Sequence, residues 1–210
     1  MASVIIHLAV AKKVNEVLKR EQNALFLGAM APDAAKLVGS SRKISHFITD
    51  PDSSTPELNI FLDKYKDDLD DTFVLGYFIH LVTDVLWFDE FLINFVNDNI
   101  ITTKTGEKLK LDDKDVLDII YNDFTSMNQE VLKYYDLNLE DFYKLESLPK
   151  SKIKEFPETY FYDVINKIKL INERKSNYSY LFNINQIVPF IEYAAVYCLD
   201  EIKRVGKTTL

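Results

Sequence analysis

One long apolar segment, residues 73–95, places the tightest constraint on the fold. Within it only His80, Asp84, Asp89 and Glu90 are readily charged, and no proline interrupts it. A helix that is apolar on nearly every side is buried by other elements, whereas a surface helix keeps a polar face. We therefore predict one long, largely buried central helix with the other elements packed around it.

The rest of the chain also favours helices. Five glycines and six prolines are few for a sheet protein of 210 residues, which would need many tight turns. Apolar residues recur at helical spacing, and the predicted helices cover residues 4–18, about 55–69, 114–134, 159–173 and 185–204. A further apolar run, residues 24–31, ends at Pro32, where we expect a break.

Residues 100–111 are the one strand candidate. They alternate apolar and polar side chains around Gly106, which suits a small β-hairpin or an ordered loop. The sequence contains no internal repeat and no composition shift that would divide it. We predict an all-α, single-domain multi-helix bundle spanning residues 1–210.

Charge and composition narrow the partners. A net charge of −8 repels phosphate polymers, so we expect no stable nucleic-acid partner. No run reaches the roughly 18 apolar residues of a transmembrane helix, and residues 1–11 lack the basic start of a signal peptide. The lone Cys198 lies in a mostly apolar run and is expected to be a packed thiol, which fits a reducing cytoplasm. The oligomeric state is not indicated.

The central segment carries a pair of chemically active side chains. His80 and Asp84 are four residues apart, so both project from one helix face and can share one ion. A buried, ionised Asp84 needs a cation, a proton or several hydrogen bonds, although a simple bond between the two side chains would also satisfy it. Gly76, one turn earlier on the same face, would let another backbone or a ligand approach closely.

The other candidate ligands cluster in the same part of the chain. His7 lies on a predicted helix, His46 in a polar loop or at a short helix end, and Asp33 just after Pro32. Taken alone, each histidine could be structural, and Asp33 could be a helix N-cap. Because imidazole and carboxylate together suit zinc, we predict a buried divalent-metal site. Its predicted ligands are His7, Asp33, His46, His80 and Asp84.

Four sequence words resemble a known family. They are HLA at residues 7–9, FLGAMAPD at 26–33, SHF at 45–47 and GYFIHLVTD at 76–84. In their order and spacing they resemble bacterial zinc-dependent phospholipase C, whose helical fold the fungal zinc-dependent nucleases share. The resemblance covers about the first 95 residues and implies the same helical fold beyond them.

The resemblance implies a ligand set. One zinc would be held by Asp33, His46, His80 and Asp84, and a neighbouring zinc by His7 with Asp84 shared between the two. The family places further histidines after the HxxxD word, where this chain has none. The carboxylates nearest those positions are Glu90, Asp123 and Glu130, so the expected cofactor is one to three divalent ions.

The implied activity is metal-dependent hydrolysis of a phosphoester, on a small soluble substrate or a phospholipid head group. By analogy Asp33 would also act as a base. Lys36, Arg42 and Lys43 could orient the phosphate, although a solvated basic loop explains them as well. The alternative function, favoured by the missing histidines, is a catalytically degenerate helical module that binds a metal or another protein.

Overall fold

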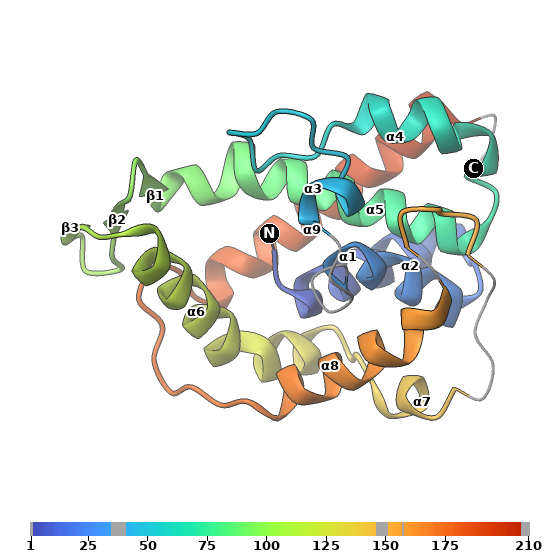
Figure 1. Ribbon diagram of the computed structural model, residues 1–210. Coiled ribbons are helices and arrows are strands. Elements are labelled where there is room, and N and C mark those ends of the chain that lie inside the picture. The colour runs from blue at the N-terminus through green and yellow to red at the C-terminus, as the bar shows by residue number, and fades with distance from the viewer. Residues whose placement is uncertain (1, 35–40, 146–150, 157, 207–210) are drawn as a thin grey trace.

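The computed structural model describes residues 2–34, 41–145, 151–156 and 158–206 (Figure 1). Most of this part is helical, and one small antiparallel sheet accompanies the helices. The helices are α1 (Val4–Leu18), α2 (Gln22–Ala34), α3 (Arg42–Ser45), α4 (Leu58–Tyr65), α5 (Thr72–Leu86), α6 (Asp113–Tyr134), α7 (Glu140–Tyr143), α8 (Phe161–Glu173) and α9 (Ile184–Val205). The strands are β1 (Val96–Asn97), β2 (Ile100–Thr102) and β3 (Lys108–Lys110). The predicted mostly-α fold is confirmed.

Helices α1, α2 and α5 form the centre of the molecule. In Figure 1, α4 and α5 lie along one side of α1 and α2, and α6 and α8 lie along the other. Helix α9 packs against both α1 and α5. Its Cys198 is fully buried, as predicted, and burial raises the pKa of this thiol to about 12.

Helix α5 begins where Asp71 accepts hydrogen bonds from the amides of Phe73 and Val74. The regular α-helix ends at Leu86, and a π-helical turn over Trp87–Phe91 and a 3-10 turn over Leu92–Asn94 complete the predicted helical segment. By length and composition Thr72–Asn94 could cross a membrane, and a buried core helix passes the same test. Here 78% of its most apolar window is covered by the rest of the protein.

Two glycines let α2 and α5 touch backbone to backbone. A Cβ atom on Gly28 would lie 2.1 Å from the carbonyl oxygen of Phe73, and one on Gly76 would lie 2.1 Å from that of Leu25. Neither position can hold a side chain without moving a helix. The close approach that the sequence predicted at Gly76 is therefore an approach of the α2 backbone.

The predicted break at Pro32 is wrong, because α2 continues through this residue to Ala34. Proline removes one helical hydrogen bond and crowds the preceding turn. The helix tolerates this cost because nearly every residue from Ala24 to Ala34 is buried. Asp33 consequently lies in the last turn of α2 instead of acting as an N-cap.

The hairpin predicted over residues 100–111 is present as β2 and β3. Gly106 lies in the connecting turn with a φ of 83°, in the left-handed region that favours glycine. The unpredicted strand β1 pairs with β2 on its other edge. The helix predicted over residues 55–69 is also shorter than expected, since α4 begins at Leu58 and a 3-10 turn over Lys66–Asp68 follows it.

Candidate metal centre

The five predicted ligands lie together in the interior. His7 comes from α1, Asp33 from the end of α2, His46 from the C-cap of α3, and His80 and Asp84 from α5. The side chains of the three histidines and of Asp84 are 0% exposed, and that of Asp33 is 10% exposed. His46 lies at a short helix end, as the sequence predicted.

A backbone carbonyl orients the ring of His80. Its Nδ1 lies 2.7 Å from the oxygen of Ala29, which can only accept a hydrogen bond. Nδ1 must therefore carry the hydrogen, which leaves the lone pair of the neutral ring on Nε2. The glycine crossing of α2 and α5 is what brings Ala29 within reach.

The ring of His46 is held in the same way. Its Nδ1 lies 3.1 Å from the carbonyl oxygen of Arg42 and 2.9 Å from Oγ of Ser45. The Ser45 hydroxyl donates to the carbonyl of Pro32 at 2.9 Å, so its oxygen is free to accept from the ring. This network assigns the hydrogen of His46 to Nδ1 and its lone pair to Nε2.

The lone pairs of His46 and His80 point toward the same place. Nε2 of His46 and Nε2 of His80 are 3.2 Å apart, and neither nitrogen has a hydrogen in these tautomers. Two bare acceptors at this separation repel each other unless a proton or a metal ion lies between them. Two ligands about 2.0 Å from a tetrahedral zinc ion are about 3.3 Å from each other, so the observed spacing suits such an ion.

The two oxygens of Asp84 divide between the histidines. Oδ1 accepts the amide hydrogen of Ala2 at 2.9 Å and lies 3.4 Å from Nε2 of His7. Oδ2 lies 3.4 Å from Nε2 of His46, 3.9 Å from that of His80 and 3.0 Å from a guanidinium nitrogen of Arg42. One carboxylate could thus contact two neighbouring cations.

Several buried polar atoms of the cluster lack partners. Neither ring nitrogen of His7 has a hydrogen bond among the described residues, although the ring stacks on His80 with centroids 3.7 Å apart. Oδ1 of Asp33 also lacks one within the same ranges and lies 3.6 Å from Nε2 of His46. Each orphaned buried group costs about 1–3 kcal/mol, so the arrangement is costly unless something binds there.

The charge states fit metal ligands. Burial lowers the pKa of His46 and lowers that of His80 well below its usual range, with the charge of His7 adding to the effect on His80. Burial opposes ionisation of the two carboxyls, but nearby positive charge outweighs it. The neighbouring histidines lower the pKa of Asp33, and the charge of the amino terminus, followed by His7 and His80, lowers that of Asp84. At neutral pH the rings of His46 and His80 are therefore neutral and the two carboxylates ionised, the forms that bind metal.

The ligand atoms gather into two overlapping sets that could hold an ion. One is His7, His80 and Asp84, and the other is Asp33, His46 and His80. Within each set all ligand atoms lie within 4.8 Å of one another. The donors and their orphaned atoms therefore fit a divalent ion, and nitrogen with carboxylate oxygen is a set that zinc accepts.

No family model, curated protein or solved structure matches this chain. The chemistry of the site therefore has to follow from its own side chains. These provide an oriented pair of imidazole nitrogens, two carboxylates and one guanidinium in a largely buried site.

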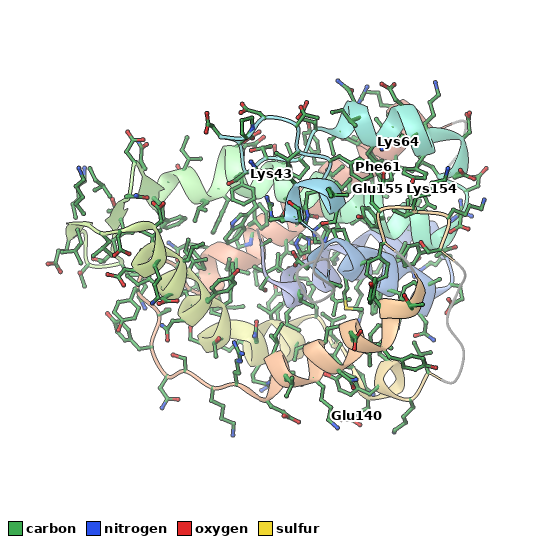
Figure 2. The ribbon with its side chains drawn as sticks, in the orientation of Figure 1. Lys43, Phe61, Lys64, Glu140, Lys154 and Glu155 are labelled. Atoms are coloured by element: carbon green, nitrogen blue, oxygen red, sulfur yellow. The ribbon has the colours of Figure 1, made fainter. Side chains whose placement is uncertain are left out.

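Of the three predicted phosphate ligands, Lys36, Arg42 and Lys43, the structure places only Arg42 at the cluster within the described residues. Arg42 reaches the cluster through Asp84. Lys43 instead donates to the carbonyl of Pro51 at 2.6 Å on the exposed side of α3, where Figure 2 labels it. Lys36 lies outside the described residues.

The three additional candidate ligands are not brought into the cluster, and none belongs to either set of metal-capable groups found within the described ranges. Asp123 is buried and accepts from the amides of Tyr180, Leu181 and Phe182 at 2.7, 2.7 and 3.2 Å. Burial raises the pKa of Asp123 against the effect of these three donors. Glu90 lines a separate groove, described below, and Glu130 is exposed on α6.

The sequence did not indicate the groups that orient the ligands. Ala29 and Arg42 act through backbone carbonyls, which carry no signal in residue identity. Ser45 was identifiable only as a polar neighbour of His46. Its burial, and the hydrogen bond of 2.6 Å that Tyr77 donates to its carbonyl, tie the end of α3 to α5.

Proposed function

We propose that the protein is a metal-dependent hydrolase of phosphoester bonds, acting with zinc on a small soluble phosphoester or a phospholipid head group. The observation that carries the proposal is the convergence of the His46 and His80 lone pairs at 3.2 Å beside two ionised carboxylates. The match of these residues to the four sequence words that resemble zinc-dependent phospholipase C supports the same function.

In the proposed function each residue has a separate task. A bound divalent ion lowers the pKa of water toward neutrality and offsets phosphate charge. His46, His80, Asp33 and Asp84 would hold it, with His7 facing the second oxygen of Asp84. By analogy with the family, the Asp33 carboxylate, whose Oδ1 lacks a hydrogen bond among the described residues, would accept a proton from the attacking water. Its lowered pKa keeps it ionised at neutral pH but also weakens it as a base. This residue is also the most exposed of the five ligands, which is where a water molecule or substrate would enter.

The test combines metal analysis with an assay. Purified protein is loaded with zinc or treated with a chelator, and its metal content is measured by elemental analysis. Both forms are then assayed on a panel of chromogenic phosphodiesters and phosphomonoesters. Turnover of at least one ester by the zinc form alone would support the proposal. Zinc binding without turnover of any ester would reject the hydrolase and leave the metal site.

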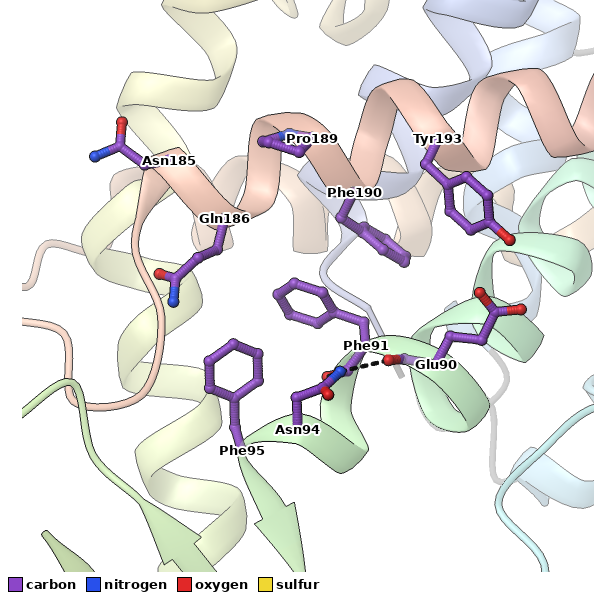
Figure 3. A pocket seen from close by; sticks show the side chains of 9 residues that line it. All are labelled: Glu90, Phe91, Asn94, Phe95, Asn185, Gln186, Pro189, Phe190 and Tyr193. Atoms are coloured by element: carbon purple, nitrogen blue, oxygen red, sulfur yellow. Dashed lines mark hydrogen bonds between the residues drawn. The ribbon is translucent and has the colours of Figure 1, made fainter. Parts of the chain in front are cut away.

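The burial of the ligand side chains favours a second candidate function, a helical module that binds a metal ion without catalysis. The ligands are almost fully covered, and a groove elsewhere in the described part of the chain is separate from them. This groove lies between the end of the α5 segment and the start of α9, and Glu90, Phe91, Phe95 and Phe190 are among its lining residues (Figure 3). A metal-binding module would hold one closed, four-ligand ion. A catalytic site needs an open coordination position, and the absorption spectrum of a cobalt-substituted protein distinguishes the two.

A further inference from the structure

We infer that Arg42 and a bound metal ion compete for Asp84, and that the Arg42 side chain turns to the phosphate of the substrate when an ion holds this carboxylate. The inference rests on the proposed metal-dependent function and adds a conformational step to it. Three features of the structure support it. The guanidinium contacts Asp84 at the edge of the site, the buried Asp84 carboxylate needs a positive charge or hydrogen bonds, and the Arg42 carbonyl orients His46 independently of the side chain.

The guanidinium of Arg42 lies at the boundary of the site. One of its nitrogens contacts Oδ2 of Asp84 at 3.0 Å, and another donates to the carbonyl of Ser54 at 2.9 Å. Its carbon lies 5.2 Å from the ring centroid of Phe88. The side chain is 18% exposed, whereas Asp84 is fully buried. Arg42 therefore reaches from solvent into a largely buried cluster.

A buried carboxylate requires compensation. The guanidinium of Arg42 and the amide of Ala2 each donate a hydrogen bond to Asp84. The same Oδ2 atom faces the lone pairs of His46 and His80, so a cation bound between those rings would use it too. An ion at that position would sit close to the guanidinium, and two like charges would then share one oxygen. Arg42 and the ion therefore compete for Asp84.

A phosphate group would bind the released guanidinium better than a metal-bound carboxylate does. Its planar fork matches a phosphate group and forms two parallel hydrogen bonds to it, an arrangement that a metal-bound carboxylate no longer offers. Arg42 is the first residue of α3, and its guanidinium contacts Asp84, while Asp33, the partly exposed member of the cluster, lies 3.6 Å from His46. Because the Arg42 side chain is 18% exposed, it can turn from Asp84 toward a phosphate that enters from solvent.

The backbone of Arg42 serves the site independently. Its carbonyl orients His46, and this contact does not depend on the side chain. Substitution of the side chain should therefore leave the histidine geometry intact. Lys43 provides a matched control, because it is the next residue, carries the same charge and directs its ammonium to Pro51, away from the cluster.

The first measurement is the affinity for Zn²⁺, determined by competition with a chromophoric chelator. We expect Arg42→Gln to bind Zn²⁺ at least about tenfold more tightly than the wild-type protein, Arg42→Lys to lie between them, and Lys43→Gln to match the wild type. Equal or weaker Zn²⁺ binding by Arg42→Gln would overturn the inference, because Arg42 would then support the carboxylate as a metal ligand. If Arg42→Gln does not fold without metal, Arg42→Lys decides, and its failure to exceed wild-type affinity overturns the inference.

The second measurement is the binding of inorganic phosphate to the zinc-loaded proteins by calorimetry. We expect Arg42→Gln to lose at least about tenfold in phosphate affinity and Lys43→Gln to lose little. Unchanged phosphate binding by Arg42→Gln would overturn the second half of the inference. A wild-type protein that binds no Zn²⁺ at all would instead reject the proposed function itself, so the two failures are distinguishable.

Discussion

The Nδ1 atom of His80 and the carbonyl oxygen of Ala29 meet at 2.7 Å across the crossing of α2 and α5. This contact exists because Gly28 and Gly76 allow the two helix backbones to touch. The orientation of a candidate metal ligand therefore depends on two glycines that offer no ligand atom themselves.

Gly76→Ala should show whether the clash at the helix crossing outweighs the higher helix propensity of alanine. In an exposed helix the change would stabilise by up to about 1 kcal/mol through helix propensity. Here the new Cβ would lie 2.1 Å from the carbonyl of Leu25, so the helices must move apart. We expect a loss of about 3 kcal/mol in the free energy of unfolding by urea denaturation, and weaker Zn²⁺ binding as Ala29 withdraws from His80.

The control for this variant is Gly206→Ala. Gly206 follows α9 with a φ of −89°, which any residue adopts, so its replacement should change neither quantity. Unchanged stability of Gly76→Ala would show that the helix crossing is looser than the structure has it.

His80→Ala and Asp84→Asn should each remove most of the bound metal. The first deletes a ligand common to both candidate sets, and the second weakens the oxygen ligand opposite His7 and His46. Asp84→Asn should also cost about 2 kcal/mol of stability, because Arg42 loses its carboxylate partner but stays partly solvated. Elemental analysis of protein purified in parallel measures the metal directly.

Glu90→Gln supplies the comparison. Glu90 lies in the separate groove, so this variant should retain its full metal content. Full metal content in both His80→Ala and Asp84→Asn would remove the metal-site proposal. Loss of metal in Glu90→Gln would show that a further site includes the groove.

Sequence patterns predicted a helix correctly where its bounds depend on residues within or next to the helix. The helical spacing of apolar residues predicted α1 with its observed bounds, because the periodicity lies within that segment and the capping residue Ser3 directly precedes it. Pro32 misled the prediction since its cost is local, whereas the burial of α2 that offsets it comes from other helices. The π-helical turn that follows Leu86 likewise has no signal in apolar periodicity.

In the candidate site, the sequence identified some metal ligands but not the groups that orient them. Ligand types and the HxxxD spacing identified His80 and Asp84, because coordination chemistry restricts which residues can serve. The carbonyls that orient the rings could not be identified, since every residue has one. Asp123 looked like a ligand because its partners, the amides of residues 180–182, lie more than 50 positions further along the chain.

The metal-free protein should lose stability as the pH falls below about 6.5. His46 and His80 have a lowered pKa when folded, so below the usual histidine pKa the unfolded chain binds more protons than the folded one. Their contribution to stability is therefore present above about pH 6.5 and decreases by up to about 1.4 kcal/mol per pH unit for each ring as the pH falls. Asp33 and Asp84, whose pKa values are also lowered, act in the same direction at lower pH.

Thermal unfolding with a chelator, from pH 8 to 5, measures this dependence. The His80→Ala variant should show a shallower decline, since one of the two rings is gone. Equal stability at pH 7.5 and 5.5 would contradict the assignment of both rings as buried and neutral.

Asp123→Asn should destabilise the protein without changing its metal content. The carboxylate of Asp123 accepts three backbone amides from the segment that leads into α9. An amide side chain offers one oxygen in place of two and turns an NH₂ group toward at least one of these donors. We expect a loss of about 2–3 kcal/mol by urea denaturation, since buried donors would be left unpaired. If Asp123 were a metal ligand, as its residue type suggested, the same variant would lose bound zinc. Measured together, stability and metal content therefore decide between a carboxylate that binds backbone amides and one that binds an ion.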